Sequence, residues 1–89
     1  MSDHAHTKQV VDRLARVEGH VGAIRRMVSE GRPCTDVLVQ IAAARSGLLA
    51  AARVLLADHM ETCVVGSLRD GDIDTHLKEL REALDRFIA

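Results

Sequence analysis

Two cysteines and one histidine are the side chains in this sequence best suited to bind a soft metal ion. His59 and Cys63 are four residues apart, so on a helix they project from one face, one turn apart. Cys34 lies 29 residues before Cys63 in a stretch, 33–65, that is predicted to form one long helix. At about 1.5 Å per residue the two thiols are then roughly 40 Å apart, too far to share an ion or a disulfide. A site that uses all three residues needs Cys34 from a second, antiparallel copy of the helix.

The donor set itself favours Cu(I), because two thiolates and one imidazole make a soft site of low coordination number. Zinc usually requires a fourth ligand. Three protein ligands also leave no open position for a substrate, which favours sensing or storage over catalysis. The alternative from the residues alone is that each cysteine is a small buried hydrophobic residue and His59 an ordinary surface residue at a helix end.

The composition indicates one small all-α domain. Of the 89 residues, 47% are apolar but only 1% aromatic, Phe87 being the single aromatic residue. Such a composition suits closely packed helices and argues against binding RNA or single-stranded DNA by base stacking. A chain of this size has a marginal core of its own, so we expect it to assemble into oligomers.

The first helix is predicted over residues 8–30. Its apolar residues recur at alternating steps of four and three, as a packed helix requires: Val10, Leu14, Val17, Val21, Ile24 and Val28. Gly31 is expected to cap its C-terminal end, and Pro33 to occupy the first turn of the next helix. Residues 1–7, which include His4 and His6, are expected to form a flexible tail before a single domain over 8–89.

The central helix is apolar nearly all the way round and rich in alanine, which predicts burial on several sides and close contact with a neighbouring helix. Gly66 and Ser67 are expected to end it. Asp70 or Asp72 should cap a third, amphipathic helix, whose apolar residues are Ile73, Leu77, Leu80, Leu84 and Phe87.

Basic residues are concentrated in the first part of the chain. The net charge is −1, yet between residues 8 and 53 eight Lys and Arg side chains stand against four Asp and Glu. A polar stripe of Gln9, Arg13, Arg16 and His20 is expected to face solvent on the first helix. In a tetramer, several copies of the stripe could cover DNA phosphates. The alternative is that these arginines solvate the helix or pair with acidic neighbours, and no helix-turn-helix signature is present.

The sequence predicts a cytoplasmic protein that is neither an enzyme nor membrane-bound. The first residues are polar and show no signal peptide, so the cysteines are expected as thiols, metal ligands or redox sensors. The apolar run 37–57 is interrupted by Gln40, Arg45 and Arg53, which makes membrane insertion costly. No glycine-rich phosphate loop, nucleophile motif or carboxylate pair accompanies His59.

Three segments resemble the CsoR/RcnR/FrmR family of bacterial metal- and small-molecule-sensing repressors: VDRLARVEGHVGAIRRM (residues 11–27), Pro33-Cys34, and DHMETC (residues 58–63). The resemblance covers nearly the whole chain. It implies a three-helix protomer, an antiparallel dimer that assembles into a dimer of dimers, binding of double-stranded operator DNA by the apoprotein, and release of DNA when the inducer binds.

Within that family the sensing positions separate the subfamilies. The copper sensors carry Cys-His-Cys at these positions, and this sequence resembles them in having Cys34, His59 and Cys63. Persulfide sensors lack the histidine, and formaldehyde sensors lack the last cysteine and use an N-terminal proline. Nickel and cobalt sensors recruit an additional N-terminal histidine, and some nickel sensors also carry Cys-His-Cys, so the resemblance leaves His4 and His6 as candidate accessory ligands. The alternative within the family is a nickel- or cobalt-sensing repressor, or a thiol-based repressor that responds to persulfide or formaldehyde.

The resemblance also implies roles outside the three ligands. Glu79 matches a glutamate of the third helix that hydrogen-bonds the liganding histidine, an arrangement that orients a ligand ring. Pro33 stands where many copper sensors have a tyrosine. The residues similar to the family's phosphate contacts and allosteric polar network are Lys8, Arg13, Arg16, Arg45 and Arg53. A metal- or redox-buffering protein without a DNA role is the alternative from another functional class.

Overall fold

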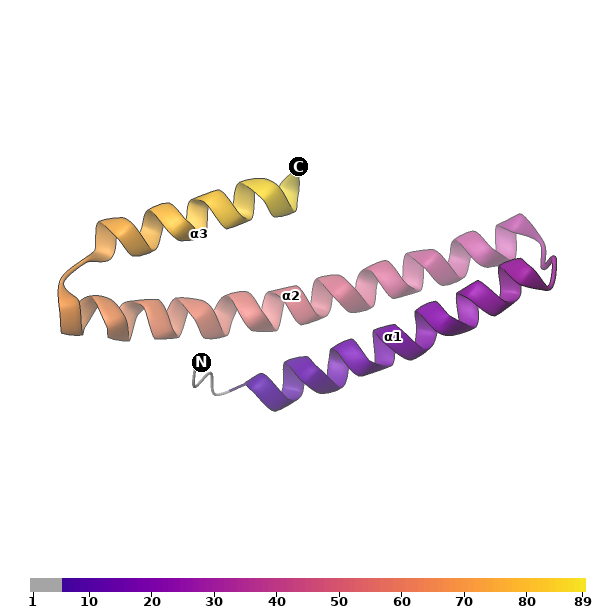
Figure 1. The fold of residues 1–89 in the computed structure, drawn as a ribbon, viewed down its shortest axis with the longest axis horizontal. Coiled ribbons are helices and arrows are strands. Elements are labelled where there is room, and N and C mark those ends of the chain that lie inside the picture. The colour runs from indigo at the N-terminus through magenta and orange to yellow at the C-terminus, as the bar shows by residue number, and fades with distance from the viewer. Residues whose placement is uncertain (1–5) are drawn as a thin grey trace.

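The computed structural model describes residues 6–89, except for the side chains of residues 63 and 64. Three helices make up this part of the chain: α1 (Thr7–Ser29), α2 (Cys34–Asp70) and α3 (Ile73–Ile88). Figure 1 shows α1 and α3 folded back along opposite halves of α2, so the molecule is long and thin, with extents of 56 × 27 × 16 Å. The predicted three-helix, all-α class with a long central helix is confirmed.

The turn between α1 and α2 is built as predicted around Gly31. This glycine has a φ of +73°, a left-handed conformation that only glycine adopts at no cost. Its N–H donates to the Val28 carbonyl at 3.1 Å, and the Arg32 N–H donates to the Met27 carbonyl at 3.0 Å. This pair of bonds is a Schellman motif, which satisfies the last carbonyls of α1. Pro33 occupies the N-cap position of α2, and Cys34 is the first helical residue. The prediction that Pro33 lies in the first turn is therefore wrong by one residue.

The predicted end of α2 at Gly66 and Ser67 is wrong, because the helix continues through both to Asp70. A glycine inside a helix costs only about 1 kcal/mol, which the flanking hydrogen bonds can outweigh. The chain instead turns at Gly71, whose φ is +68°. Asp72 then caps α3, with its carboxylate accepting a 3.3 Å hydrogen bond from the Thr75 N–H, as predicted.

The core is a seam between α1 and α2 with a spacing of seven residues on each helix. Its buried members are Val10, Val17 and Ile24 on α1 and Val37, Ala44 and Ala51 on α2. A seven-residue repeat keeps one narrow face of each helix turned toward its partner. Alanine on the α2 side permits close approach, and at Gly47 an added Cβ would lie 2.9 Å from a methyl group of Val17.

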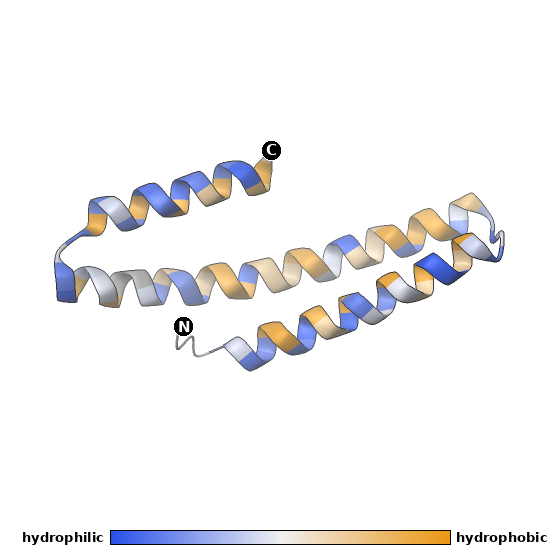
Figure 2. Ribbon diagram, in the orientation of Figure 1, coloured by the Kyte–Doolittle hydropathy of each residue, from blue (hydrophilic) through white to orange (hydrophobic). Residues whose placement is uncertain are grey.

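Most of α2 outside this seam is exposed in the single chain. Figure 2 shows apolar residues along much of the helix, and many of the large ones are open to solvent: Leu38, Val39, Ile41, Leu48, Leu55, Met60, Val65 and Leu68. The prediction that α2 is buried on several sides is therefore wrong for a single chain. Such a helix buries its remaining faces only by packing against another molecule.

By length and hydropathy alone, α2 also qualifies as a membrane-spanning helix. That criterion is met equally by the core helices of proteins that never enter a membrane, and α2 carries Arg45 and Arg53 within its apolar stretch.

Candidate functional site

The predicted Cu(I) ligands are distributed along α2. Cys34 is the first residue of the helix and is exposed. His59 follows 25 residues later on the same unbroken helix, a separation of roughly 37 Å at about 1.5 Å per residue. The helix also includes Cys63, whose side chain lies outside the described part of the structure. A single chain therefore cannot bring Cys34 to His59.

His59 and Glu79 line the same groove, which lies between α2 and α3. The groove has a volume of about 470 Å³ and is mainly apolar. The other residues that line it are Leu49, Ala52, Arg53, Leu55, Leu56, Leu80, Ala83, Leu84 and Phe87. The structure thus brings together two residues that sequence reasoning paired, and adds Arg53, one of the predicted DNA contacts, to the same groove.

The polar stripe on α1 faces solvent only in part: Gln9 and Arg16 are exposed as predicted, whereas Arg13 and His20 are half-buried. Arg13, Arg16 and His20 line a smaller groove of about 130 Å³ between α1 and α2. His20 is half-buried, and its Nε2 lies 2.8 Å from the Gln40 side-chain oxygen on α2. The prediction is wrong for Arg13 and His20, because the sequence periodicity gives a polar face but not its direction. The narrow seam leaves room beside it for polar side chains to reach α2.

The other predicted DNA contacts are more scattered. Lys8, near the start of α1, is exposed and forms a 2.8 Å ion pair with Asp12 one turn later. Hydrogen bonding to Asp12, followed by its charge, raises the pKa of Lys8, so this ammonium group stays charged. Arg45 is exposed on α2. The structure thus groups Arg13 with Arg16, places Arg53 in the groove that His59 also lines, and leaves Lys8 and Arg45 apart.

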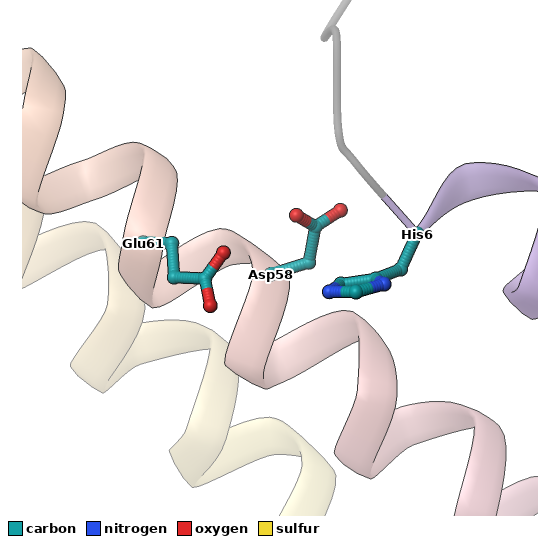
Figure 3. A group of neighbouring side chains, drawn as sticks. All are labelled: His6, Asp58 and Glu61. Carbon is teal, nitrogen blue, oxygen red and sulfur yellow. The ribbon is translucent and has the colours of Figure 1, made fainter.

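His6 lies beside two acidic residues that sequence reasoning did not select. Ligand atoms of His6, Asp58 and Glu61 all lie within 4.8 Å of one another, and Figure 3 shows His6 next to the two carboxylates of α2. The spacing of three residues between Asp58 and Glu61 was a usable signal, because it places both on one helix face. His4, the other proposed accessory ligand, lies outside the described residues.

Comparison with known proteins gives the same family for sequence and fold. Residues 6–86 match the family model described as "Metal-sensitive transcriptional repressor". The chain is 39% identical to the copper-sensing transcriptional repressor RicR of Mycobacterium tuberculosis, over 96% of this chain and 94% of that protein. It is 38% identical to the copper-sensing transcriptional repressor CsoR of Bacillus subtilis, over 89% of this chain and 78% of that protein.

Two solved structures share the fold. The nickel-responsive transcriptional regulator InrS is 44% identical, with a TM-score of 0.79 over 98% of both chains. The copper-sensing repressor CsoR with Cu(I) from Geobacillus thermodenitrificans is 31% identical, with a TM-score of 0.86 over 100% of this chain and 92% of that one. Because the family model matches residues 6–86 and relatives that are 38–39% identical align over most of the chain, the chain belongs to the family of metal-sensitive transcriptional repressors.

Proposed function

We propose that the protein is a cytoplasmic Cu(I)-sensing repressor that binds operator DNA without metal and releases it when Cu(I) binds. The observation that carries this proposal is the continuity of α2, which separates Cys34 from His59 along one rigid element. Each Cu(I) would be held by Cys34 of one protomer and by His59 and Cys63 of its partner. Two thiolates and one imidazole suit Cu(I) better than harder ions, and the copper-sensing relatives point the same way.

The required dimer is supported by the surface of α2. One face of the helix packs against α1, while large apolar side chains on other faces are exposed in the single chain. A second α2 laid antiparallel would cover this surface, and would also bring Cys34 of one chain toward the opposite end of the other helix. Each Å² of apolar surface buried would stabilise this pairing by about 25 cal/mol. We propose that two such dimers form the DNA-binding tetramer.

DNA binding would rest on phosphate contacts from Lys8, Arg13, Arg16, Arg45 and Arg53. With a net charge of −1, affinity would depend on how the assembly aligns these side chains rather than on overall attraction. Such contacts release counterions from DNA, so operator affinity should fall steeply as salt rises.

The groove between α2 and α3 offers a route from metal to DNA contact. His59 and Glu79 line it from facing helices, and Arg53 lies in the same groove. Metal binding would fix the orientation of the His59 ring. A hydrogen bond from the ring to Glu79 would then couple this orientation to the position of α3. Coupling between two binding sites in proteins is typically about 1–3 kcal/mol, enough to lower operator affinity by about 5- to 150-fold.

Nickel is the second candidate inducer. InrS, which is named as nickel-responsive, shares 44% identity over 98% of this chain, and His6 supplies an imidazole at the start of α1. Imidazole nitrogen is a good ligand for Ni(II), whereas a purely sulfur-rich set favours Cu(I).

An anaerobic titration of the protein–operator complex would decide between these inducers. Cu(I), Ni(II), Zn(II), formaldehyde and persulfide are each added while DNA release is followed by fluorescence anisotropy. We expect about one equivalent of Cu(I) per chain to release the DNA and to lower operator affinity by about 5- to 150-fold. Release by Ni(II) alone would support the second candidate, and an apoprotein without salt-sensitive operator binding would refute the repressor function.

A further inference from the structure

The buried seam between α1 and α2 continues at a charged residue. On α2 the buried positions Val37, Ala44 and Ala51 are followed seven residues later by Asp58, which is only 2% exposed. The seam is otherwise apolar in both helices. Burial of a carboxylate is costly unless polar or charged groups lie around it, and two such groups next to Asp58 are the side chains of His6 and Glu61.

His6 and Glu61 complete a cluster around this buried carboxylate. Glu61 lies one turn after Asp58 on α2, and His6 precedes the first residue of α1. The three side chains offer one nitrogen and two oxygen ligand atoms that lie within 4.8 Å of one another. Figure 3 shows the imidazole and the two carboxylates gathered where the start of α1 meets α2.

The geometry is close to that of a metal site. Zinc binds nitrogen and carboxylate oxygen at about 2.0–2.2 Å, so the ligand atoms around one ion lie closer together than the 4.8 Å limit within which these three atoms lie. His6 and Glu61 are both exposed, so rotation of their side chains can close this difference while Asp58 stays in place. A divalent ion would also offset the repulsion between two adjacent carboxylates.

We propose that His6, Asp58 and Glu61 form a second metal site, for a divalent ion such as Zn(II), with water completing its coordination. A set of two carboxylates and one imidazole, without sulfur, favours Zn(II), Co(II) or Ni(II) over Cu(I). The site is therefore chemically distinct from the thiolate site proposed for sensing.

The two sites also occupy different faces of α2. Neighbouring residues on a helix are about 100° apart around its axis. Asp58 is turned toward α1, whereas His59 lines the groove with α3 on the other side of α2. An ion at the second site would join the start of α1, next to Lys8, to the C-terminal half of α2. It would add a contact between α1 and α2 beyond Val10, the first buried residue of the seam on α1.

The test uses Co(II), whose absorption spectrum reports its ligands. A Cys34→Ser/Cys63→Ser chain removes the thiolates, and Co(II) is titrated into the full-length protein under anaerobic conditions. Should that variant not fold, the unaltered protein already loaded with Cu(I) takes its place. We expect about one Co(II) per chain, with visible d–d bands, without thiolate charge-transfer absorption, and displaced by Zn(II).

Single substitutions His6→Ala and Glu61→Gln in the same background identify the ligands. Loss of an outer partner of a ligand already costs about 10- to 100-fold in metal affinity, so loss of a direct ligand should cost at least as much. His76→Ala is the matched control, because His76 pairs with Asp70 at 3.2 Å near the α2–α3 turn and should leave Co(II) affinity unchanged. Absence of Co(II) binding, or binding that either ligand substitution leaves unweakened, would overturn the proposal.

Discussion

Gly47 tests whether the close approach of α1 and α2 is required for stability. A Cβ added at this position would lie 2.9 Å from Cγ2 of Val17, a buried residue of the seam. Substitution Gly47→Ala should gain about 1 kcal/mol from helix propensity. It should lose about 1–3 kcal/mol through overpacking, because a packed β-branched side chain has little freedom to move aside.

Gly19→Ala is the matched control. Gly19 also lies inside a helix, but nothing lies within 4 Å of its added Cβ, so the substitution should gain the same propensity without the clash. The two variants should then differ by about 1–3 kcal/mol in the free energy of unfolding. For a domain of 60–100 residues, each kcal/mol corresponds to roughly 4–8 °C in Tm.

Thermal and urea unfolding should be followed by circular dichroism at one fixed protein concentration, because assembly makes stability depend on concentration. On a Val17→Ala background the methyl group is gone, so Gly47→Ala should now be neutral or stabilising. Equal stability of Gly47→Ala and Gly19→Ala would refute the contact between the helices at this point.

Three further predictions concern the metal site and the α2–α3 turn. Neither a Cys34→Ala chain nor a Cys63→Ala chain alone should hold Cu(I) tightly, but after mixing, the heterodimer should regain one intact site, measured by competition with a Cu(I) chelator. Glu79→Ala should lower Cu(I) affinity by about tenfold, the low end of the range for loss of a partner of a ligand, and should weaken DNA release, measured by operator anisotropy, if this residue acts through the His59 ring. Hydrogen bonding from the Asp72 N–H, then from His76, lowers the pKa of Asp70 below its usual 3.8, so the charged form is favoured in the folded chain. The Asp70 carboxylate therefore stabilises the fold fully at pH values above its ordinary pKa, and this stabilisation is lost as pH falls through the lowered pKa. Asp70→Asn should reduce this pH dependence, measured by acid unfolding below about pH 4.

Each of these predictions has a clear contrary result. Mixed chains that bind no Cu(I) would exclude a site shared between antiparallel protomers. Glu82→Ala, a nearby substitution on α3, serves as control for Glu79→Ala, and equal DNA release by both would remove Glu79 from the coupling. An Asp70→Asn protein with unaltered acid unfolding would show that the turn does not depend on this carboxylate.

The sequence alone determined the three helices, because apolar residues at steps of three and four specify helical faces and Gly31 requires a left-handed turn. It also determined the likeness to metal-sensing repressors, through the local spacing of His59 and Cys63 and the α1 motif. Such features depend on a few neighbouring residues, so they can be predicted without knowing which helices pack against each other. The end of α2 was misplaced because a glycine such as Gly66 is tolerated inside a helix when its neighbours continue the hydrogen bonding.

Only the tertiary structure decided which faces meet. The direction of the Arg13–His20 stripe, the shared groove of His59 and Glu79, and the gathering of His6 with Asp58 and Glu61 all depend on how α1 and α3 lie along α2. Those contacts join residues up to 55 positions apart, and their register follows from the buried seam. Periodicity fixes each face of a helix, but side-chain packing between helices selects the partner of that face.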